Sequence, residues 1–478
     1  MDEKGSGSCQ SSFQGLQEKN DKWPASKRRK SDVSSTSQDM LQDPQGVLDC
    51  EGNIEENLES DPLTVNDLFD ELLQKIFSHF SALDLYGTIA KVCVRWERIA
   101  KDPCTLNKTQ LFLDDKDQTL YMEVLKEAPC IGEVYILPSY PPDAMNYLIR
   151  GPTVRKLVII AESEWYRNWP TPADLIALLA HNKLTLQHLS MQVDRELIQS
   201  HKSKDSTDGV SFQSLIAGMK RLSHLHLVGE YWRDWDEWDL SLEHPHLRTL
   251  KIDSLSFISD ECPFIRDLIM LCKPTLRVLC LPCQLPDDAS SLLNAGVFQG
   301  SLVEELMVST GCLRVVSQMP HLKILAVSDN GKEDGDLKWF KQTPMLSGVW
   351  KLTLQSLMET EGERQGFVWH LLSKFNNVRE FWGLESCIEE ETFNMFLRNN
   401  AFLAEMHFFD FAGFDNPNQV KLVENFLPNL SLLDVSLTQV SEEMYSTLDS
   451  FNKRKPNLKI VLGDDLETEV IRPFTEGL

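Results

Sequence analysis

The chain has 478 residues and a formal net charge of −25, from 72 acidic and 47 basic residues. This acidic balance argues against nucleic acid or an anionic membrane as the main partner, because both require clustered lysine and arginine. The sequence has no run of about 18 apolar residues and no apolar core of signal-peptide length near its start, so we expect a soluble intracellular protein.

Residues 1–62 are predicted to form a disordered tail. They are rich in Ser, Gln, Asp, Glu and Lys, with too few apolar residues for a core. Lys27, Arg28, Arg29 and Lys30 form a basic run that could direct nuclear import, although such runs also occur in solvated tails without that role. Eleven scattered cysteines fit reduced thiols, so the expected location is cytoplasm, nucleus or both.

Residues 63–110 are predicted to hold three short amphipathic helices. In the first, apolar residues recur every fourth position with further apolar residues beside them: Leu68, Leu72, Ile76 and Phe80, then Phe69, Leu73 and Phe77. Ser81 and Asp84 predict a capping box for the second helix, which buries Leu85 and Ile89. The third is expected to turn Val92, Trp96, Ile99 and Ala100 inward and to end before Pro103. This module has little core of its own, so it must cover apolar surface with a neighbour or a partner.

The order of residue types in this module resembles an F-box. The resemblance is carried by Leu68, Glu71-Leu72-Leu73, Ile76-Phe77, Phe80, Asp84-Leu85, Val92-Cys93, Arg95-Trp96 and Ile99. It implies a surface for a Skp-family adaptor, formed by Leu68, Phe69, Glu71, Leu72, Ile76, Phe77, Leu85 and Trp96. Phe69 stands where the family has a proline that normally meets the adaptor. The alternative is that these helices only cap the repeats that follow.

From about residue 128 a phrase of the form apolar-x-x-apolar-x-apolar keeps returning. Its first apolar positions are Ile131, Val154, Leu186, Leu222, Leu247, Leu276, Val303, Leu322, Val349, Val378, Leu403, Leu430 and Leu458. The mean spacing of about 27 residues lies within the 20 to 29 residues of leucine-rich repeats. Residues 111–465 are therefore predicted to form a solenoid of about 12 to 13 repeats, followed by a C-terminal tail at 466–478.

Each phrase predicts a strand whose side chains alternate between two faces. Leu225 and Leu227 would point into the core, and His224 and His226 onto the concave face of a parallel sheet. Helical spacing between the phrases predicts helices on the convex face, at 172–182, 212–220, 264–273, 287–296, 366–375, 390–400, 419–427 and 441–451. Only a single turn is expected at 311–318. The predicted fold class is α/β: a short all-α F-box of three helices, then a curved leucine-rich-repeat solenoid.

The array resembles the leucine-rich-repeat half of F-box proteins. The combined resemblance implies a substrate receptor of a Skp–cullin–F-box ubiquitin ligase, in which the F-box holds the adaptor, and through it the cullin, and the array holds an unknown protein substrate for ubiquitination and degradation. Such a receptor acts by proximity and has no catalytic residue. The alternative is an interaction scaffold whose F-box no longer engages the ligase.

Two groups of residues are candidates for substrate binding. Aromatic residues interleaved with charges, as in interface hot spots, are predicted in loops after two strands: Trp165 and Trp169, then Tyr231, Trp232, Trp235 and Trp238. These aromatics could instead pack over the edge of the array. Concave-face candidates are His188, His224, His226, Lys251, Asp253, Glu380, Trp382, Glu405, His407 and Phe409. Their mixed chemistry suits a protein or peptide more than a charged small ligand.

Enzymatic and metal-binding alternatives have weak support. Cys280 and Cys283 have the spacing of a metal or redox pair, but Cys280 falls on a repeat strand and no second pair lies nearby. His224 and His226 lack a carboxylate within their phrase, which favours a surface pair. There is no phosphate-binding glycine loop, nucleophile elbow or kinase signature. We expect no enzyme activity, no cofactor and no metal.

Overall fold

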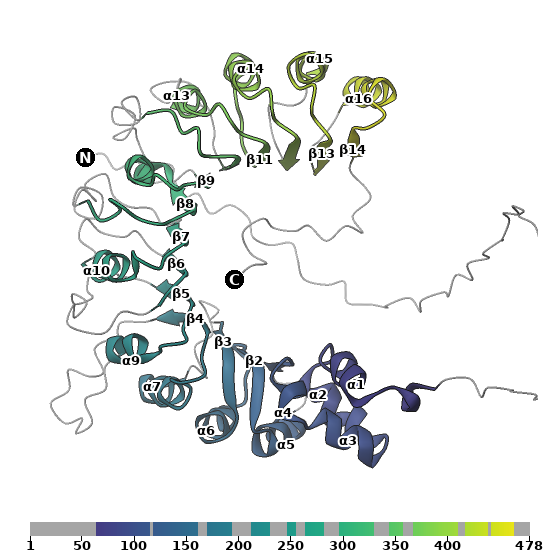
Figure 1. Ribbon diagram of the computed structural model, residues 1–478, viewed down its shortest axis with the longest axis vertical. Helices are drawn as coiled ribbons and strands as arrows, with labels where there is room; N and C mark the ends of the chain where they lie inside the picture. Colours follow the sequence, from purple (N-terminus) through teal and green to yellow (C-terminus); the bar gives the residue numbers. More distant parts are fainter. Residues whose placement is uncertain are drawn as a thin grey trace, which may run out of the picture. The chain divides into compact units, whose positions relative to one another are not determined.

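The computed structural model describes residues 64–114, 118–160, 170–193, 212–229, 246–254, 263–281, 296–328, 344–356, 367–409, 416–437 and 441–462. Together they belong to one compact unit, Thr64–Leu478. A helical module comes first, and a parallel sheet of 14 strands follows in chain order, with its helices along one side (Figure 1). Within these ranges no helix combines the length and apolar character needed to cross a membrane.

The strands are short and evenly distributed along the chain. Their bounds are β1 Gln110–Leu113, β2 Cys130–Ile136, β3 Thr153–Ile159, β4 His188–Val193, β5 His224–Gly229, β6 Thr249–Ser254, β7 Val278–Leu281, β8 Glu305–Ser309, β9 Ile324–Ser328, β10 Lys351–Gln355, β11 Glu380–Leu384, β12 Glu405–Phe409, β13 Leu432–Leu437 and β14 Lys459–Leu462. Every strand after β1 contains or closely follows the first apolar position of one predicted phrase, so the repeat prediction is confirmed.

The helices divide into two groups. Those of the N-terminal module are η1 Val65–Asp67, α1 Asp70–Phe77, α2 Ala82–Gly87, η2 Ile89–Lys91, α3 Val94–Ala100 and α4 Pro103–Leu106. Those beside the sheet are α5 Gln118–Glu127, α6 Pro142–Arg150, α7 Pro172–His181, α9 Phe212–Gly218, α10 Pro263–Cys272, η6 Thr310–Gln318, α13 Phe367–Leu372, α14 Glu390–Asn399, α15 Pro417–Phe426 and α16 Glu442–Arg454.

The two faces of the sheet differ in burial, as the alternation of side chains requires. Leu189, Leu225 and Leu250 are paired in register on β4, β5 and β6, and all are at most 1% exposed. Each parallel strand thus stacks its leucines on those of its neighbours, and the helices cover this side. The opposite side, which we call the open face, carries the residues aligned with His224 and His226 in each strand.

Several sequence expectations need correction or lie outside the described residues. Strand β1 and helices α4, α5 and α6 were not anticipated, and Val92, expected to face inward, is 57% exposed between η2 and α3. The short interval predicted to hold one turn contains the 3-10 helix Thr310–Gln318. The helix predicted at 287–296 lies almost wholly outside the described residues, as do the N-terminal tail and residues 466–478.

Two buried asparagines join successive repeats. Asn182 accepts a hydrogen bond from the backbone N–H of Val154 (2.6 Å) and donates to the Leu178 carbonyl (3.0 Å). Asn400 accepts from the N–H of Val378 (2.9 Å), and it donates to the carbonyls of Phe396 (2.9 Å) and Phe375 (3.1 Å). Both asparagines are fully buried, so each satisfies backbone groups that water cannot reach.

A close backbone approach joins the helical module to the sheet. Gly132 in β2 lies beside the turn that leads from α4 to β1. A Cβ atom there would come within 2.6 Å of the Asn107 carbonyl oxygen and 2.9 Å of the Thr109 carbonyl oxygen. Because these are backbone atoms that cannot swing aside, only glycine allows β2 to pack this tightly against the end of the module.

Leu250→Asp is expected to unfold much of the array. The substitution places an unpaired charge in a fully buried position and removes apolar contact, so the free energy of unfolding should fall by about 4 kcal/mol or more. Far-ultraviolet circular dichroism and urea denaturation measure the effect. Leu184→Asp is the control, because Leu184 is 76% exposed. Equal stability of the two variants would contradict the stacked leucine core.

Asn400→Leu is expected to lower the free energy of unfolding by about 2 to 4 kcal/mol, because the Val378 N–H and the Phe375 carbonyl lose their buried partner. Chemical denaturation measures the change. The neighbouring Asn399→Leu is the control, since Asn399 is exposed and should shift stability by about 0.5 kcal/mol or less. A loss for Asn400→Leu no larger than the control's would show that this amide is dispensable.

Candidate interaction surfaces

An exposed apolar surface lies on the outer side of α1. Phe69 is 75% exposed, and Leu72, Ile76 and Phe80 follow it at helical spacing, each more than 40% exposed. Seven of the fourteen exposed large apolar residues in the described ranges fall between Val65 and Val94. A cluster this dense on one short module indicates a binding surface, because soluble proteins rarely leave such patches uncovered. We call Phe69, Leu72, Ile76 and Phe80 the α1 surface.

The inner side of α1 holds this surface in place. Leu73 and Phe77 are at most 2% exposed, and the Phe77 ring meets the Trp96 ring edge-on at 5.2 Å between centroids. Trp96 also donates a hydrogen bond from Nε1 to the Asn66 side chain (3.0 Å). The same helix thus presents one apolar side to the core and a second apolar side to the exterior.

Charged groups tie the start of α1 to α3. Arg95 donates to Asp70 Oδ1 from Nε (2.9 Å) and Nη2 (2.7 Å), and it also donates to the carbonyls of Asn66 and Leu68. Arg98 pairs with the other oxygen of Asp70. The Arg98 and Arg95 guanidiniums together hold the pKa of Asp70 below its ordinary value. These contacts fix the chain just before α1, where Phe69 projects.

The backbone at Phe69 keeps a conformation that proline would adopt. Its φ of −63° matches the fixed φ of proline, and the preceding Leu68 is extended with ψ 142°. The next helix, α2, begins with the predicted capping box: the Ser81 hydroxyl accepts from the Asp84 N–H (3.1 Å), and Asp84 Oδ2 accepts from the Ser81 N–H (3.3 Å). The local geometry of the module is therefore intact despite the phenylalanine.

The structure separates the predicted adaptor-binding residues into three sets. Phe69, Glu71, Leu72 and Ile76 are exposed, whereas Phe77 and Leu85 lie in the core and support the surface from beneath. Leu68 and Trp96 are partly buried against that core. Val65 and Val94, which are 51% and 83% exposed, were not among the sequence candidates. The only sequence signal for Val65 and Val94 is that each is apolar at a position where packing does not require an apolar residue.

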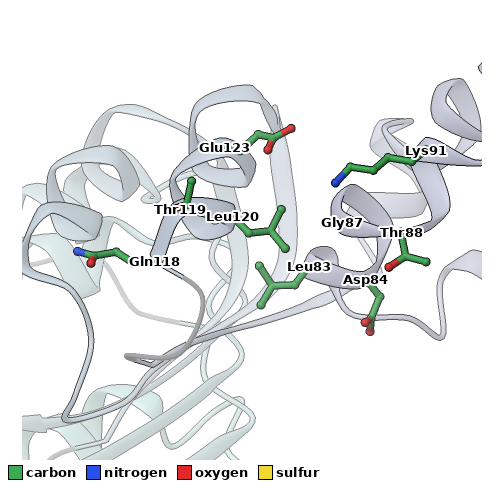
Figure 2. Close-up of a pocket in the computed structure, with 9 residues that line it drawn as sticks. All are labelled: Leu83, Asp84, Gly87, Thr88, Lys91, Gln118, Thr119, Leu120 and Glu123. Atoms are coloured by element: carbon green, nitrogen blue, oxygen red, sulfur yellow. The ribbon is translucent and has the colours of Figure 1, made fainter.

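The module is continuous with the first repeat. Lys101, at the end of α3, binds Glu97 (3.1 Å) and Glu127 of α5 (3.0 Å). A shallow pocket of about 620 Å³ lies where α2 meets α5, and in Figure 2 Leu83 and Leu120 point toward each other while Lys91 and Glu123 line its rim. Its lining is mainly polar and shared by both parts, so we assign it to the junction.

The first part of the open face carries an aromatic and ionic cluster. The Phe112 and Tyr135 rings stack at 4.6 Å between centroids, and Lys156 lies 5.4 Å from the centre of the Tyr135 ring. Tyr135 donates its hydroxyl to Glu133 (2.8 Å), which also pairs with Lys156 (3.4 Å). Cross-strand pairs of this kind stabilise the sheet and leave polar groups available to a partner.

Histidines dominate the next strands. The His188 and His224 rings stack at 5.1 Å, while His226 bonds to Ser190 through Nδ1 and to Asp253 through Nε2, both at 2.8 Å. The carboxylate that the His224-x-His226 phrase lacks is thus supplied by the adjacent strand. Burial alone would raise the pKa of Asp253, but the His226 bond and the Lys251 charge lower it overall.

A second aromatic and ionic cluster spans β10 to β13. Lys351 pairs with Glu380 (2.6 Å), which also accepts from Nε1 of Trp382 (2.6 Å). The Trp382 ring, only 9% exposed, stacks on His407 at 3.8 Å and on Phe409 at 5.6 Å. Beside it, a surface pocket of about 500 Å³ is lined by Gly348, Trp350, Asn377, Arg379, Glu380, Ala404 and Glu405.

The predicted open-face candidates are therefore brought onto one side of the sheet in two separate clusters, around His226 and around Trp382. Cys280 lies on the same face between them, 1% exposed, and burial raises the pKa of its thiol to about 12, so it is not a reactive cysteine. Cys283 and the six loop aromatics lie outside the described residues: Trp165, Trp169, Tyr231, Trp232, Trp235 and Trp238.

His188 is expected to make the array less stable in acid. Burial, with smaller effects of Lys156 and His224, lowers its pKa from 6.5 to about 4. Between those values the unfolded chain binds a proton that the folded chain does not, so stability should fall as pH drops from about 6.5 to 4 and be insensitive to this group above that window. Relative to His188→Gln, the parent should lose on the order of 1 kcal/mol more between pH 7 and pH 5.

Urea denaturation at both pH values measures this difference. His246→Gln is the control, because His246 is exposed on the described part of the chain. If His188→Gln and the parent lost stability in parallel, His188 would not be the responsible group.

Comparisons with known proteins identify the helical module. The F-box domain model matches residues 65–108, and no curated protein matches the chain. Among solved structures, the crystal structure of the yeast Rad7 and Elc1 complex aligns with 13% identity and a TM-score of 0.40, covering 82% of this chain and 92% of that one. The Drosophila Toll–Spatzle complex aligns with 14% identity and a TM-score of 0.36, covering 74% and 43%. The chain thus carries an F-box domain at residues 65–108, followed by a solenoid of leucine-rich-repeat type.

Proposed function

We propose that this protein is the substrate-recognition subunit of a Skp–cullin–F-box ubiquitin ligase. The observation that carries the proposal is the α1 surface of a matched F-box domain: Leu72 and Ile76 on α1, Phe69 just before it and Phe80 just after it are all exposed. Burying them against an apolar partner would contribute roughly 25 cal/mol for each Å² removed from water. A Skp-family adaptor fits this surface, and it would connect the chain to the cullin.

The open face is the part of the chain that we propose to hold the protein substrate. It presents half-buried histidine, lysine, aromatic and acidic side chains on a rigid sheet, a composition that suits a protein surface. The F-box domain shares one hydrophobic core with the repeats, so a bound substrate would be held at a fixed place relative to the adaptor. The contribution to ubiquitination would be proximity, and no residue of this chain would take part in the chemistry.

The test is binding of purified Skp-family adaptor to the full chain, measured by isothermal titration calorimetry. Phe69→Asp with Ile76→Asp is expected to weaken binding at least about 100-fold, because two apolar anchors are replaced by charges. The variant should keep its circular dichroism and melting temperature, since both side chains are exposed. Phe402→Asp, 64% exposed near β12, is the matched control and should bind like the parent.

Phe69→Pro tests whether adaptor binding requires the aromatic side chain at position 69 or only the backbone conformation that proline would adopt. The backbone already has the conformation of proline, so the variant should fold and should bind the adaptor within about tenfold of the parent. If the folded parent chain bound no adaptor, the ligase function would be rejected and an interaction scaffold capped by the F-box would be the better explanation. Binding by the double aspartate variant at parental affinity would reject the α1 surface.

A further inference from the structure

Three potential metal ligands converge on strands β11 and β12. Glu380, Glu405 and His407 each offer one ligand atom, and these atoms lie within 4.8 Å of one another. His407 Nε2 is 3.8 Å from Glu405 Oε2. Ligands of a tetrahedral zinc ion lie about 3.4 Å apart, given bond lengths near 2.1 Å. The Glu405 side chain is 47% exposed, so it is free to close the remaining distance.

His407 supplies a second, independent observation. The residue is 7% exposed, and its Nε2 atom is buried without a hydrogen-bond partner among the described residues. A buried polar nitrogen left unpaired is costly, typically about 1 to 3 kcal/mol. This atom faces Glu405, so an ion bound between them would satisfy it.

The other ring nitrogen fixes the orientation of the imidazole. Nδ1 of His407 bonds to Oδ2 of Asp434 on β13 at 3.4 Å, and Trp382 stacks on the ring with an interplanar angle of 8°. A proton on Nδ1 leaves the lone pair of Nε2 for a metal. Histidine ligands almost always have such a carboxylate or carbonyl on the second nitrogen, which sets the tautomer and raises the ligand's basicity.

The excess of negative charge at the cluster also favours binding of a cation. Glu380, Glu405 and Asp434 bring three carboxylates, and Lys351 brings one positive charge by pairing with Oε1 of Glu380. Among these four groups the carboxylates outnumber the single cation, so the local potential favours a bound cation. Within the described residues both contacts of Glu380, from Lys351 and Trp382, fall on Oε1, so its second oxygen can turn toward an ion.

The first aromatic and ionic cluster of the open face, around Glu133, contains a comparable ion pair but no counterparts of Glu405 and His407. Glu133 occupies the same position in its strand as Glu380, pairs with Lys156 and accepts a hydrogen bond from Tyr135. On β3 and β4, however, the positions next along the sheet hold Lys156 and His188 and not a second carboxylate. A glutamate, a lysine and an aromatic residue therefore form such a cluster without Glu405 or His407. The presence of those two residues beside Glu380 requires another explanation.

We propose that Glu380, Glu405 and His407 bind one divalent transition-metal ion, zinc in the first instance, with Asp434 as the positioning residue for His407. Two carboxylates and an imidazole suit zinc and neighbouring first-row ions better than calcium or magnesium, which prefer oxygen alone. Three protein ligands leave a fourth position for water or for a side chain of a bound protein. The proposal does not depend on adaptor binding.

The test uses the full chain, stripped of metal with a chelator and titrated with zinc chloride by calorimetry. Cobalt chloride is a parallel probe, because visible absorption reports its coordination. Glu405→Gln is the main ligand variant, since a half-exposed side chain can be changed without unfolding the chain. His407→Gln, Asp434→Asn and the matched control Glu133→Gln complete the set.

The parent and Glu133→Gln should bind one zinc ion with equal affinity and gain thermal stability from it. Glu405→Gln should bind at least about tenfold more weakly, Asp434→Asn about 10 to 100-fold more weakly, and both should change the cobalt spectrum. Zinc should not raise the melting temperature of His407→Gln. Equal zinc affinity in the parent and Glu405→Gln would overturn the proposal, because the ion would then bind elsewhere, and so would the absence of binding by the parent at about 100 μM zinc.

Discussion

The stacking of apolar side chains between successive strands is the constraint on which the rest of the structure depends. One residue from each of the strands β1 to β13 forms a continuous buried row: Leu111, Val134, Leu157, Leu189, Leu225, Leu250, Leu279, Leu306, Leu325, Leu352, Phe381, Met406 and Leu433. No repeat can bury its own apolar side alone, so each depends on its neighbours. Because this row fixes the register, it also decides which polar residues meet on the open face.

Much of this arrangement follows from the sequence. The spacing of the phrase gives the strands, and aligning neighbouring phrases is enough to place Glu380 beside Glu405 and His407 beside Asp434. The repeat phrase does not predict strand β1, because Lys108 occupies the position aligned with Ile131, the first apolar residue of the next phrase. At this end of the array Lys108 is exposed, so that position needs no apolar residue. Helices α5 and α6 did have a signal, in the spacing of Tyr121, Val124 and Leu125 and of Ala144, Met145 and Leu148.

The interaction surfaces were harder to predict, for a physical reason. An apolar helix face is needed both for packing and for binding, so the pattern of α1 cannot tell Phe77, which is buried, from Ile76, which is exposed. The positions of α3, held by the Arg95 contacts, and of α4 decide which side of α1 is covered. The stacking of Trp382 on His407 likewise depends on side-chain conformations that no spacing determines.

The connection through Gly132 means that no flexible linker separates the F-box domain from the first strand. Parallel strands lie about 4.8 Å apart, so a position on the sheet is set by the number of strands that precede it. From β1 to β11 there are ten such steps, about 48 Å measured along the sheet. Loss or gain of one early repeat would shift every later residue by a single step and leave the α1 surface unchanged. Under the proposed ligase function, the number of repeats would therefore set the distance between the bound adaptor and the substrate, and with it the substrate lysine that is presented, while both contact surfaces stay the same.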